Sequence, residues 1–395
     1  MANSYEFVST GEPCDITDVW TFERLKRPVM TWRHALYALY APLGLCVLAL
    51  RVVVLIVVMA ALRCCVPLRC RQRVAAPLYL NVVGPLLGVW MRAHDLGVLD
   101  AALLDARARG EKVVLTCNHV TPLDPIFVAV LLGARRGGDC ALVCRAMYDF
   151  FWKFLQSVGF LAPGDDALLY VHFFGTDAER EGTRGAVANE IAHHRERALL
   201  VFPEAVVSNR GAVLRYQAGV LGHPRTLLVP LALRVTFPWP VECTDPFGSF
   251  PATFVWWFFS PFLGVELRVC AAIRPEGAVQ GQPQRGARTR TKSAAVAIAL
   301  RAQLATAECL GRRAVTIDYK EKVRLNMALG TTPFAEFPRY AGATAREAAA
   351  GSLWFGGGRE ALRTYRAWLA AHPRVPAAAK ATLRRLEESE RRKTV

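Results

Sequence analysis

The chain has 395 residues, 53% of them hydrophobic, and a formal net charge of +16. This length allows one large domain or two ordinary ones, and the hydrophobic share is high for a soluble globule. The charge favours an anionic partner, and we expect a membrane surface and no nucleic acid, because the basic residues are scattered and form no nucleic-acid-binding motif. Eleven cysteines without paired spacing predict reduced thiols and no metal site.

The first apolar segment follows a polar stretch, residues 1–34, which we expect to be a cytosolic arm. From Ala35 to Leu62 the only charged side chain is Arg51. One helix of this length would reach about 42 Å, beyond a bilayer core of about 30 Å, and Pro42 and Gly44 predict a bend. Basic residues flank both ends of the segment: Arg24, Lys26, Arg27, Arg33, Arg63, Arg69, Arg71 and Arg73. Because both flanks favour the cytosolic side, we expect residues 35–74 to form a membrane-embedded hairpin, with a single-pass anchor as the alternative.

This segment contains one charged side chain, and three cysteines follow it. Arg51 near mid-span would cost roughly 3 kcal/mol in a membrane unless it reaches a headgroup. Cys64, Cys65 and Cys70 lie just beyond the apolar run, at a place where palmitoylation is chemically possible.

The next segment carries a polar pair between a strand and a helix. Residues 75–110 predict mostly helix, and Val113–Leu115 predicts a short buried strand. Asn118 and His119 follow this strand, and Asp124 begins another apolar run. A carboxylate that accepts a hydrogen bond from one ring nitrogen makes the other nitrogen a base. The alternative is a helix-capping Asp beside an ordinary His.

Strands and helices then alternate along the chain. We expect strands at Ala141–Cys144, Leu168–Phe174, Ala198–Glu204 and Leu227–Val235, and helices at Tyr148–Val158 and Asp177–Arg197. This order predicts an α/β domain over residues 75–274, with a mostly parallel sheet flanked by helices. Since chemistry gathers at the carboxyl ends of such strands, His119 and Glu204 become candidate site residues.

The remainder of the chain begins with an aromatic stretch. Residues 247–263 hold two Trp and six Phe without a charge, which favours either a membrane interface or a buried core. Residues 275–395 predict a polar loop and a basic helical tail, with helices at Ser293–Leu310 and Ile317–Leu329. Protein partners are expected to bind through this tail.

Three blocks in order resemble the glycerolipid acyltransferases, the N-H-x-x-x-x-D enzymes of phospholipid synthesis: NHVTPLD (Asn118–Asp124), FPEAVVSNR (Phe202–Arg210) and VPLAL (Val229–Leu233). The resemblance implies acyl transfer from acyl-CoA, a co-substrate and not a bound cofactor, to a lysophospholipid or glycerol-phosphate hydroxyl. It implies that His119 is the general base and Asp124 its orienting carboxylate. It places Asn118, Glu204, Asn209 and Arg210 at the acceptor, although a solvated loop charge is the alternative for Arg210.

A longer stretch, from about Ala35 to Arg324, is similar to the ancient ubiquitous protein family. That resemblance implies a monotopic protein on the cytosolic face of the endoplasmic reticulum membrane and on lipid droplets. Ala205, Val206 and Val207 depart from the F-P-E-G-T-R-S block of the acyltransferases, and its phosphate-binding arginine is missing. The departures keep open an alternative function, a non-catalytic adaptor that retains the acyltransferase fold.

Overall fold

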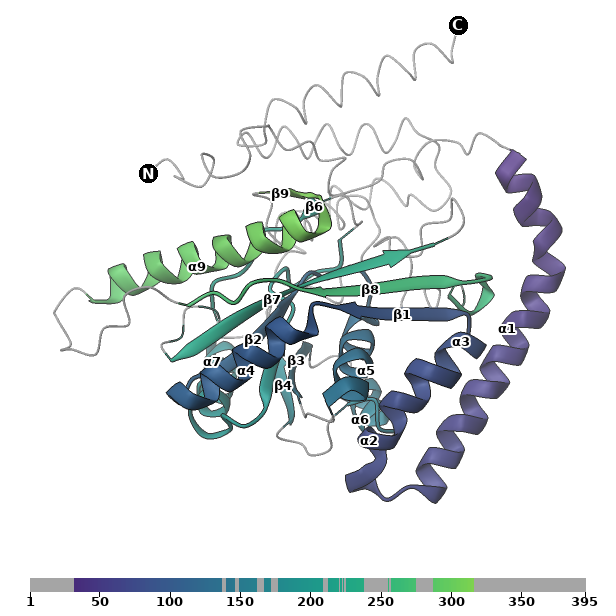
Figure 1. The fold of residues 1–395 in the computed structure, drawn as a ribbon, viewed down its shortest axis with the longest axis horizontal. Coiled ribbons are helices and arrows are strands. Elements are labelled where there is room, and N and C mark those ends of the chain that lie inside the picture. The colour runs from purple at the N-terminus through teal and green to yellow at the C-terminus, as the bar shows by residue number, and fades with distance from the viewer. Residues whose placement is uncertain are drawn as a thin grey trace, which may run out of the picture.

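The computed structural model describes residues 32–136, 140–145, 149–161, 167–171, 177–208, 212–219, 221, 223, 225–237, 255, 257–274 and 287–315. Across these residues a seven-stranded sheet lies between helices (Figure 1). The described strands are β1 (Val89–His94), β2 (Lys112–Cys117), β3 (Cys140–Arg145), β4 (Leu168–Val171), β5 (Ala198–Val201), β6 (Ala212–Val213), β7 (Thr226–Thr236), β8 (Leu263–Val269) and β9 (Arg313–Ala314).

The large sheet is mostly parallel, as predicted. Its strand order is β1-β8-β7-β2-β5-β3-β4, and β6 and β9 form a separate two-stranded sheet. All neighbouring pairs of the large sheet are parallel except β7 and β8, which are antiparallel. The central strand β2 pairs with β5 on one side and β7 on the other. The carboxyl ends of β2 and β5 therefore lie side by side.

Helices cover both faces of the sheet. Those described are α1 (Trp32–Cys65), α2 (Leu68–Leu78), α3 (Gly84–Leu86), α4 (Leu96–Arg109), α5 (Asp124–Arg136), α6 (Asp149–Ser157), α7 (Asp177–His193) and α9 (Ala287–Leu310), with a π-helical turn, η3, at Tyr79–Val83. Side chains of α4, α5 and α6 share one core with Val113 and Leu115 of β2. Side chains of α7 and α9 share the other core with Val114. This alternation along β2 buries the strand on both faces, as its apolar run predicts.

Two boundaries differ from the expected ones. Residues 75–110 hold an edge strand, β1, as well as helices, and β1 pairs with β8. The expected tail boundary at residue 274 is too early, because α9 packs on the sheet and buries Ile298 and Ala302 in the second core. The predicted helix Ile317–Leu329, the arm at residues 1–31 and residues 316–395 lie outside the described residues.

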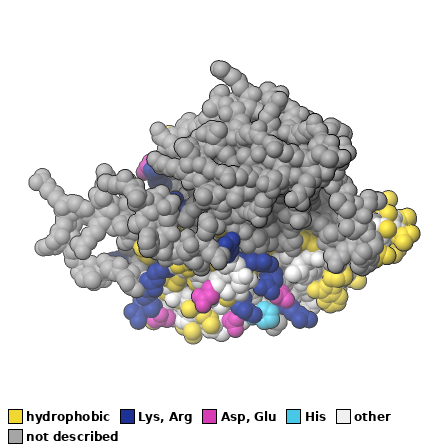
Figure 2. All heavy atoms as spheres, turned by 90° about the horizontal axis from the view of Figure 1, so that it is seen from above, with side chains coloured by type: hydrophobic (Ala, Val, Ile, Leu, Met, Phe, Trp, Pro, Cys, Tyr) yellow, Lys and Arg dark blue, Asp and Glu magenta, His cyan; other side chains and the backbone are white. Residues whose placement is uncertain are grey.

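α1 is not interrupted at Pro42, where the sequence predicts a bend, and continues as one helix from Trp32 to Cys65. The chain turns only after Cys65, and α2 runs back beside α1 (Figure 1). One described helix, with its apolar stretch at Ala38–Cys65, is long and apolar enough to cross a membrane by length and composition. Figure 2 shows apolar side chains gathered at the end of the molecule where α1 lies.

Arg51 of α1 contacts the sheet domain. Its guanidinium donates to the backbone oxygens of Phe258 (3.0 Å), Ser260 and Pro261 (2.7 Å). A Cβ at Gly88 would overlap this guanidinium, and the φ of +72° at Gly88 also favours glycine. The charge that would be costly in lipid is buried against protein carbonyls, and α1 is docked along the domain.

The described part of the aromatic stretch expected at 247–263 is mostly buried, and a membrane interface remains a prediction. Trp257 is buried and stacks on Phe127 of α5, with ring centroids 4.9 Å apart. Phe259 is buried beside Tyr40 of α1, whereas Phe262 is half-exposed. The segment thus joins α1 to the core.

Candidate functional site

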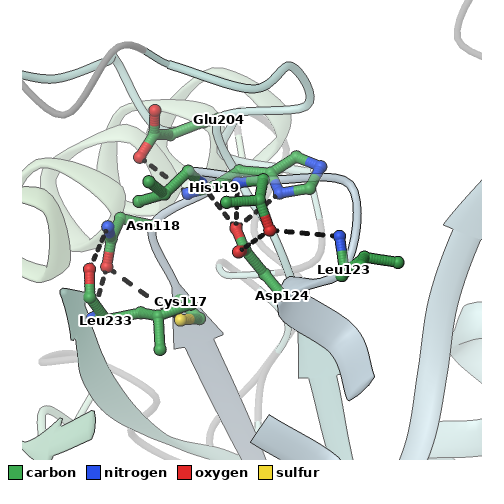
Figure 3. A network of polar contacts seen from close by, with 9 residues as sticks. Cys117, Asn118, His119, Leu123, Asp124, Glu204 and Leu233 are labelled. Carbon is green, nitrogen blue, oxygen red and sulfur yellow. Dashed lines mark hydrogen bonds and ion pairs between the residues drawn. The ribbon is translucent and has the colours of Figure 1, made fainter. Parts of the chain in front are cut away.

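The candidate site lies at the carboxyl end of β2, where the chain passes into α5 (Figure 3). His119 follows β2, and Asp124 begins α5. Glu204 follows β5, the parallel neighbour of β2. The structure therefore brings together His119, Asp124 and Glu204 from two strand ends, as the element order predicts.

His119 and Asp124 form a paired base and carboxylate. Nδ1 of His119 lies 3.0 Å from Oδ2 of Asp124. Asp124 is fully buried, whereas the His119 side chain is 19% exposed. Because an ionised carboxylate only accepts hydrogen bonds, Nδ1 carries the proton and Nε2 is left as the basic nitrogen. The pair has the geometry of a general base with an accessible ring.

Asp124 also accepts hydrogen bonds from the turn that precedes α5. Its Oδ2 accepts from the backbone N–H groups of Val120 (2.5 Å) and Thr121 (2.8 Å), and its Oδ1 accepts from the Thr121 hydroxyl at 2.7 Å. The Thr121 Oγ1 in turn accepts from Leu123 N at 3.1 Å. The Asp124 carboxylate thus holds the turn that leads into α5 while it also pairs with His119.

Asn118 occupies a different place from the expected one. Its Nδ2 donates to the Leu233 oxygen at 2.9 Å, and its Oδ1 accepts from Leu233 N at 2.7 Å. The buried amide therefore pairs with the backbone of β7 in the manner of a peptide group. In this geometry Asn118 fixes the position of the chain directly before His119, and its contact with an acceptor stays a prediction.

The loop after β5 holds His119 from both sides of its backbone. Oε1 of the fully buried Glu204 accepts from His119 N at 3.1 Å, and Ser208 N donates to His119 O at 2.7 Å. The Phe202 ring lies against the imidazole, with centroids 4.9 Å apart. In the described geometry Glu204 positions the catalytic candidate through its backbone, a role that sequence reasoning did not assign to it.

Backbone strain lies next to Glu204. Ala205 has φ +60°, a left-handed conformation that costs a residue with a Cβ roughly 1–2 kcal/mol. Ala205 N donates to Phe202 O at 2.9 Å, which closes the tight turn. The departure of Ala205 from the glycine of the acyltransferase block therefore falls on a position that favours glycine.

A second nucleophile is disfavoured at this strand end. Cys117 is fully buried, and burial, with Asp124 and Glu204 nearby, raises the pKa of its thiol well above the ordinary value. The thiol stays protonated at neutral pH and is a poor nucleophile. Among the described residues, no group of three or more His, Cys, Asp or Glu is placed to hold a metal ion.

Sequence reasoning missed three contributors: Thr121, Phe202 and Ser208. The T-x-x-D spacing of Thr121 and Asp124 is a capping signal that would have found the first. The other two act through tertiary contacts and carry no local signal. The expected acceptor contacts Asn209 and Arg210 lie outside the described residues.

Comparison with known families agrees with this geometry. A family model described as Acyltransferase matches residues 101–233. The matched range begins in α4, ends in β7 and contains His119, Asp124 and Glu204. No curated protein matches the chain. Residues 101–233 thus form an acyltransferase domain whose family chemistry is acyl transfer.

Proposed function

We propose that the acyltransferase domain of residues 101–233 transfers an acyl group from acyl-CoA to the hydroxyl of a lysophospholipid or glycerol phosphate. The observation that carries this proposal is the His119–Asp124 pair at 3.0 Å, placed at the carboxyl end of a central parallel strand. Nothing in this chemistry requires a bound cofactor, since acyl-CoA is consumed as a substrate.

The reaction follows from the roles of the two side chains. Nε2 of His119 takes the proton of the acceptor hydroxyl, and the oxygen attacks the thioester carbonyl. The new C–O bond forms, the C–S bond breaks, and coenzyme A leaves as a thiol with the proton that His119 carried. Asp124 holds the ring in the tautomer that makes Nε2 the base and stabilises the imidazolium formed in the step.

The apolar surface of α1 supports a membrane location for this chemistry. Leu39, Leu43, Leu50 and Val57 on α1 are more than half exposed, as is Trp90 on β1. Apolar exposure on this scale is typical of a surface that meets lipid or another protein. Together with the basic flanks of α1, it supports the cytosolic face of a membrane, for which we propose the endoplasmic reticulum and lipid droplets.

The test uses the purified full-length protein in detergent or in vesicles. Acyl-CoA is offered with a panel of lysophospholipids and glycerol phosphate, and the acylated product is identified by mass spectrometry. We expect a product that depends on both substrates and is absent with His119→Ala. Acyl-CoA hydrolysis without an acylated acceptor, or equal product with His119→Ala, would contradict the proposal.

The second candidate function is a non-catalytic adaptor. It is favoured by the strained Ala205 and by Val206 and Val207, which stand where the acyltransferase block carries polar residues. A well-folded wild-type protein without product across the whole acceptor panel would support this candidate over the enzyme.

A further inference from the structure

The exposed thiols of the described chain are confined to its apolar N-terminal part. Of the described cysteines, Cys46, Cys64, Cys65 and Cys70 are exposed. The others, which are Cys117, Cys140, Cys144, Cys270 and Cys309, belong to the sheet domain and are buried or partly buried. Free cysteine is among the most buried residue types, so a group of exposed thiols requires an explanation.

Three of these thiols lie around one short turn. Cys64 and Cys65 end α1, and Cys70 lies in the first turn of α2. Because α1 and α2 run back beside each other, the turn forms one end of this helical pair (Figure 1). The thiols are therefore presented together at a single end of the longest apolar element described.

Arg71 holds this turn against the sheet domain. Its Nε donates to Val66 O at 3.0 Å, its Nη2 donates to Arg63 O at 3.0 Å, and its Nη1 donates to Ser157 O at the end of α6. One guanidinium thus ties both sides of the turn to the domain. The thiols are held at a fixed place.

The chemical surroundings of the turn differ from those of Cys46. Cys46 lies among exposed apolar residues of α1 such as Leu43 and Leu50, where a small apolar side chain suits a lipid-facing surface. Cys64 follows the exposed Arg63, the basic residue of the last turn of α1. The turn therefore marks a change from apolar to basic surface, which is the character of a lipid headgroup region.

We propose that Cys64, Cys65 and Cys70 form an S-acylation site that takes a long-chain fatty acyl group. A cysteine sulfur attacks the carbonyl of a fatty acyl-CoA, a new C–S bond forms, the C–S bond to coenzyme A breaks, and coenzyme A leaves with the proton that the cysteine gave up. The proposal rests on the membrane attachment in the proposed function. A lipid chain at this end supplements the apolar α1, because stable anchoring commonly uses two signals.

The test follows an alkynyl fatty acid in cells that express the full-length chain. We expect a label on the protein that hydroxylamine removes, as it removes thioesters. The triple variant Cys64→Ser, Cys65→Ser, Cys70→Ser should lose at least about nine-tenths of this label. Cys46→Ser, the matched exposed control, should keep it.

The opposite results are equally clear. A hydroxylamine-sensitive label that persists in the triple variant, or is lost with Cys46→Ser alone, would overturn the site. A wild-type chain without label would overturn it as well. Absence of label with intact acyl transfer to lysolipid would defeat this inference alone, whereas a label on the turn without any acyl transfer would defeat the proposed enzyme alone.

Discussion

Ionisable residues lie at both ends of strand β2, but their surroundings differ. At its amino end, Lys112 is fully buried, and its Nζ donates to Glu190 Oε1 at 2.7 Å and to the His194 backbone oxygen. Arg197 donates to both carboxylate oxygens of Glu190, at 2.8 and 2.5 Å. At its carboxyl end, His119 is paired through one nitrogen only and is 19% exposed. One end is closed, and the other presents a basic atom outward.

The difference separates a structural cluster from a chemical one. Burial lowers the pKa of Lys112 below its ordinary value, while Glu190 acts in the opposite direction and keeps the ammonium paired. Such a cluster has no access to a substrate, so its effect is confined to stability. His119 is paired through Nδ1 and partly exposed, so we expect its effect to be on chemistry. Lys112 is buried and fully paired, which marks a structural role. His119 is partly exposed and paired through one nitrogen, which marks a chemical role.

The largest expected effect comes from Asp124→Asn at the carboxyl end. An amide presents an NH₂ to Nδ1 of His119 and favours the wrong tautomer, so acyl transfer should fall about 10²–10⁴-fold. Steady-state rates across acceptor concentrations check this. Thr121→Val is the matched control, because it removes a hydroxyl from the Asp124 carboxylate but leaves the carboxylate itself. A fall of less than about tenfold in Asp124→Asn would argue against the paired base.

At the amino end we expect Lys112→Met to act on stability alone. Removal of one partner leaves Glu190 and Arg197 to repack in a buried site, which should cost about 3–5 kcal/mol. The melting temperature should fall by about 2–4 °C per kcal/mol. Arg109→Met is the control, since the Arg109–Asp105 pair is exposed and should be worth about 0–1 kcal/mol. Equal melting temperatures for the two variants would show that the buried cluster is not structural.

We expect a smaller loss of stability from a change at Arg51, the charged residue that joins α1 to the sheet domain. Arg51→Met removes the donor to three backbone oxygens, and we expect a loss of about 1–3 kcal/mol in the unfolding free energy. Arg51→Lys should recover part of this loss, because an ammonium still donates to some of the oxygens. Thermal unfolding in detergent measures both variants. If Arg51→Met has the same melting temperature as wild type, Arg51 does not hold α1 to the domain.

The smallest expected effect is an increase in stability. Ala205→Gly removes the strain of φ +60° beside Glu204 and should stabilise the fold by about 1 kcal/mol. The same change at the exposed Ala101 of α4 should destabilise by about 1 kcal/mol, because glycine weakens a helix. Denaturant unfolding compares the two. A destabilised Ala205→Gly would show that the methyl group packs usefully in the turn.

Local patterns predicted the elements that carry the site. The apolar run of β2 predicts a buried central strand, and the order of strands and helices places His119 and Glu204 at neighbouring strand ends. The pairing of His119 with Asp124 follows from their spacing across a strand-to-helix junction. These features depend on residues close together in the chain or on rules common to parallel sheets.

Features that depend on distant partners were missed. Asn118 pairs with Leu233, 115 residues away, and Arg51 is bound by oxygens more than 200 residues away. The edge strand β1 was missed because its alternating, half-exposed residues lie between helices. The role of α9 was missed because its buried side chains are mostly alanines, with Ile298 among them, and its partner strands lie far away in the sequence. None of these contacts leaves a local sequence signal.

The central claim is that chemistry and stability are separated along β2, and one side-by-side measurement tests it. Acyl-transfer rate per folded molecule and melting temperature are measured together for wild type, His119→Ala and Lys112→Met. We expect that His119→Ala loses about 10²–10⁴-fold in rate with little change in melting temperature, whereas folded Lys112→Met keeps its rate but melts at a lower temperature. A His119→Ala protein that transfers acyl groups like wild type, or a stable Lys112→Met protein without activity, would contradict it.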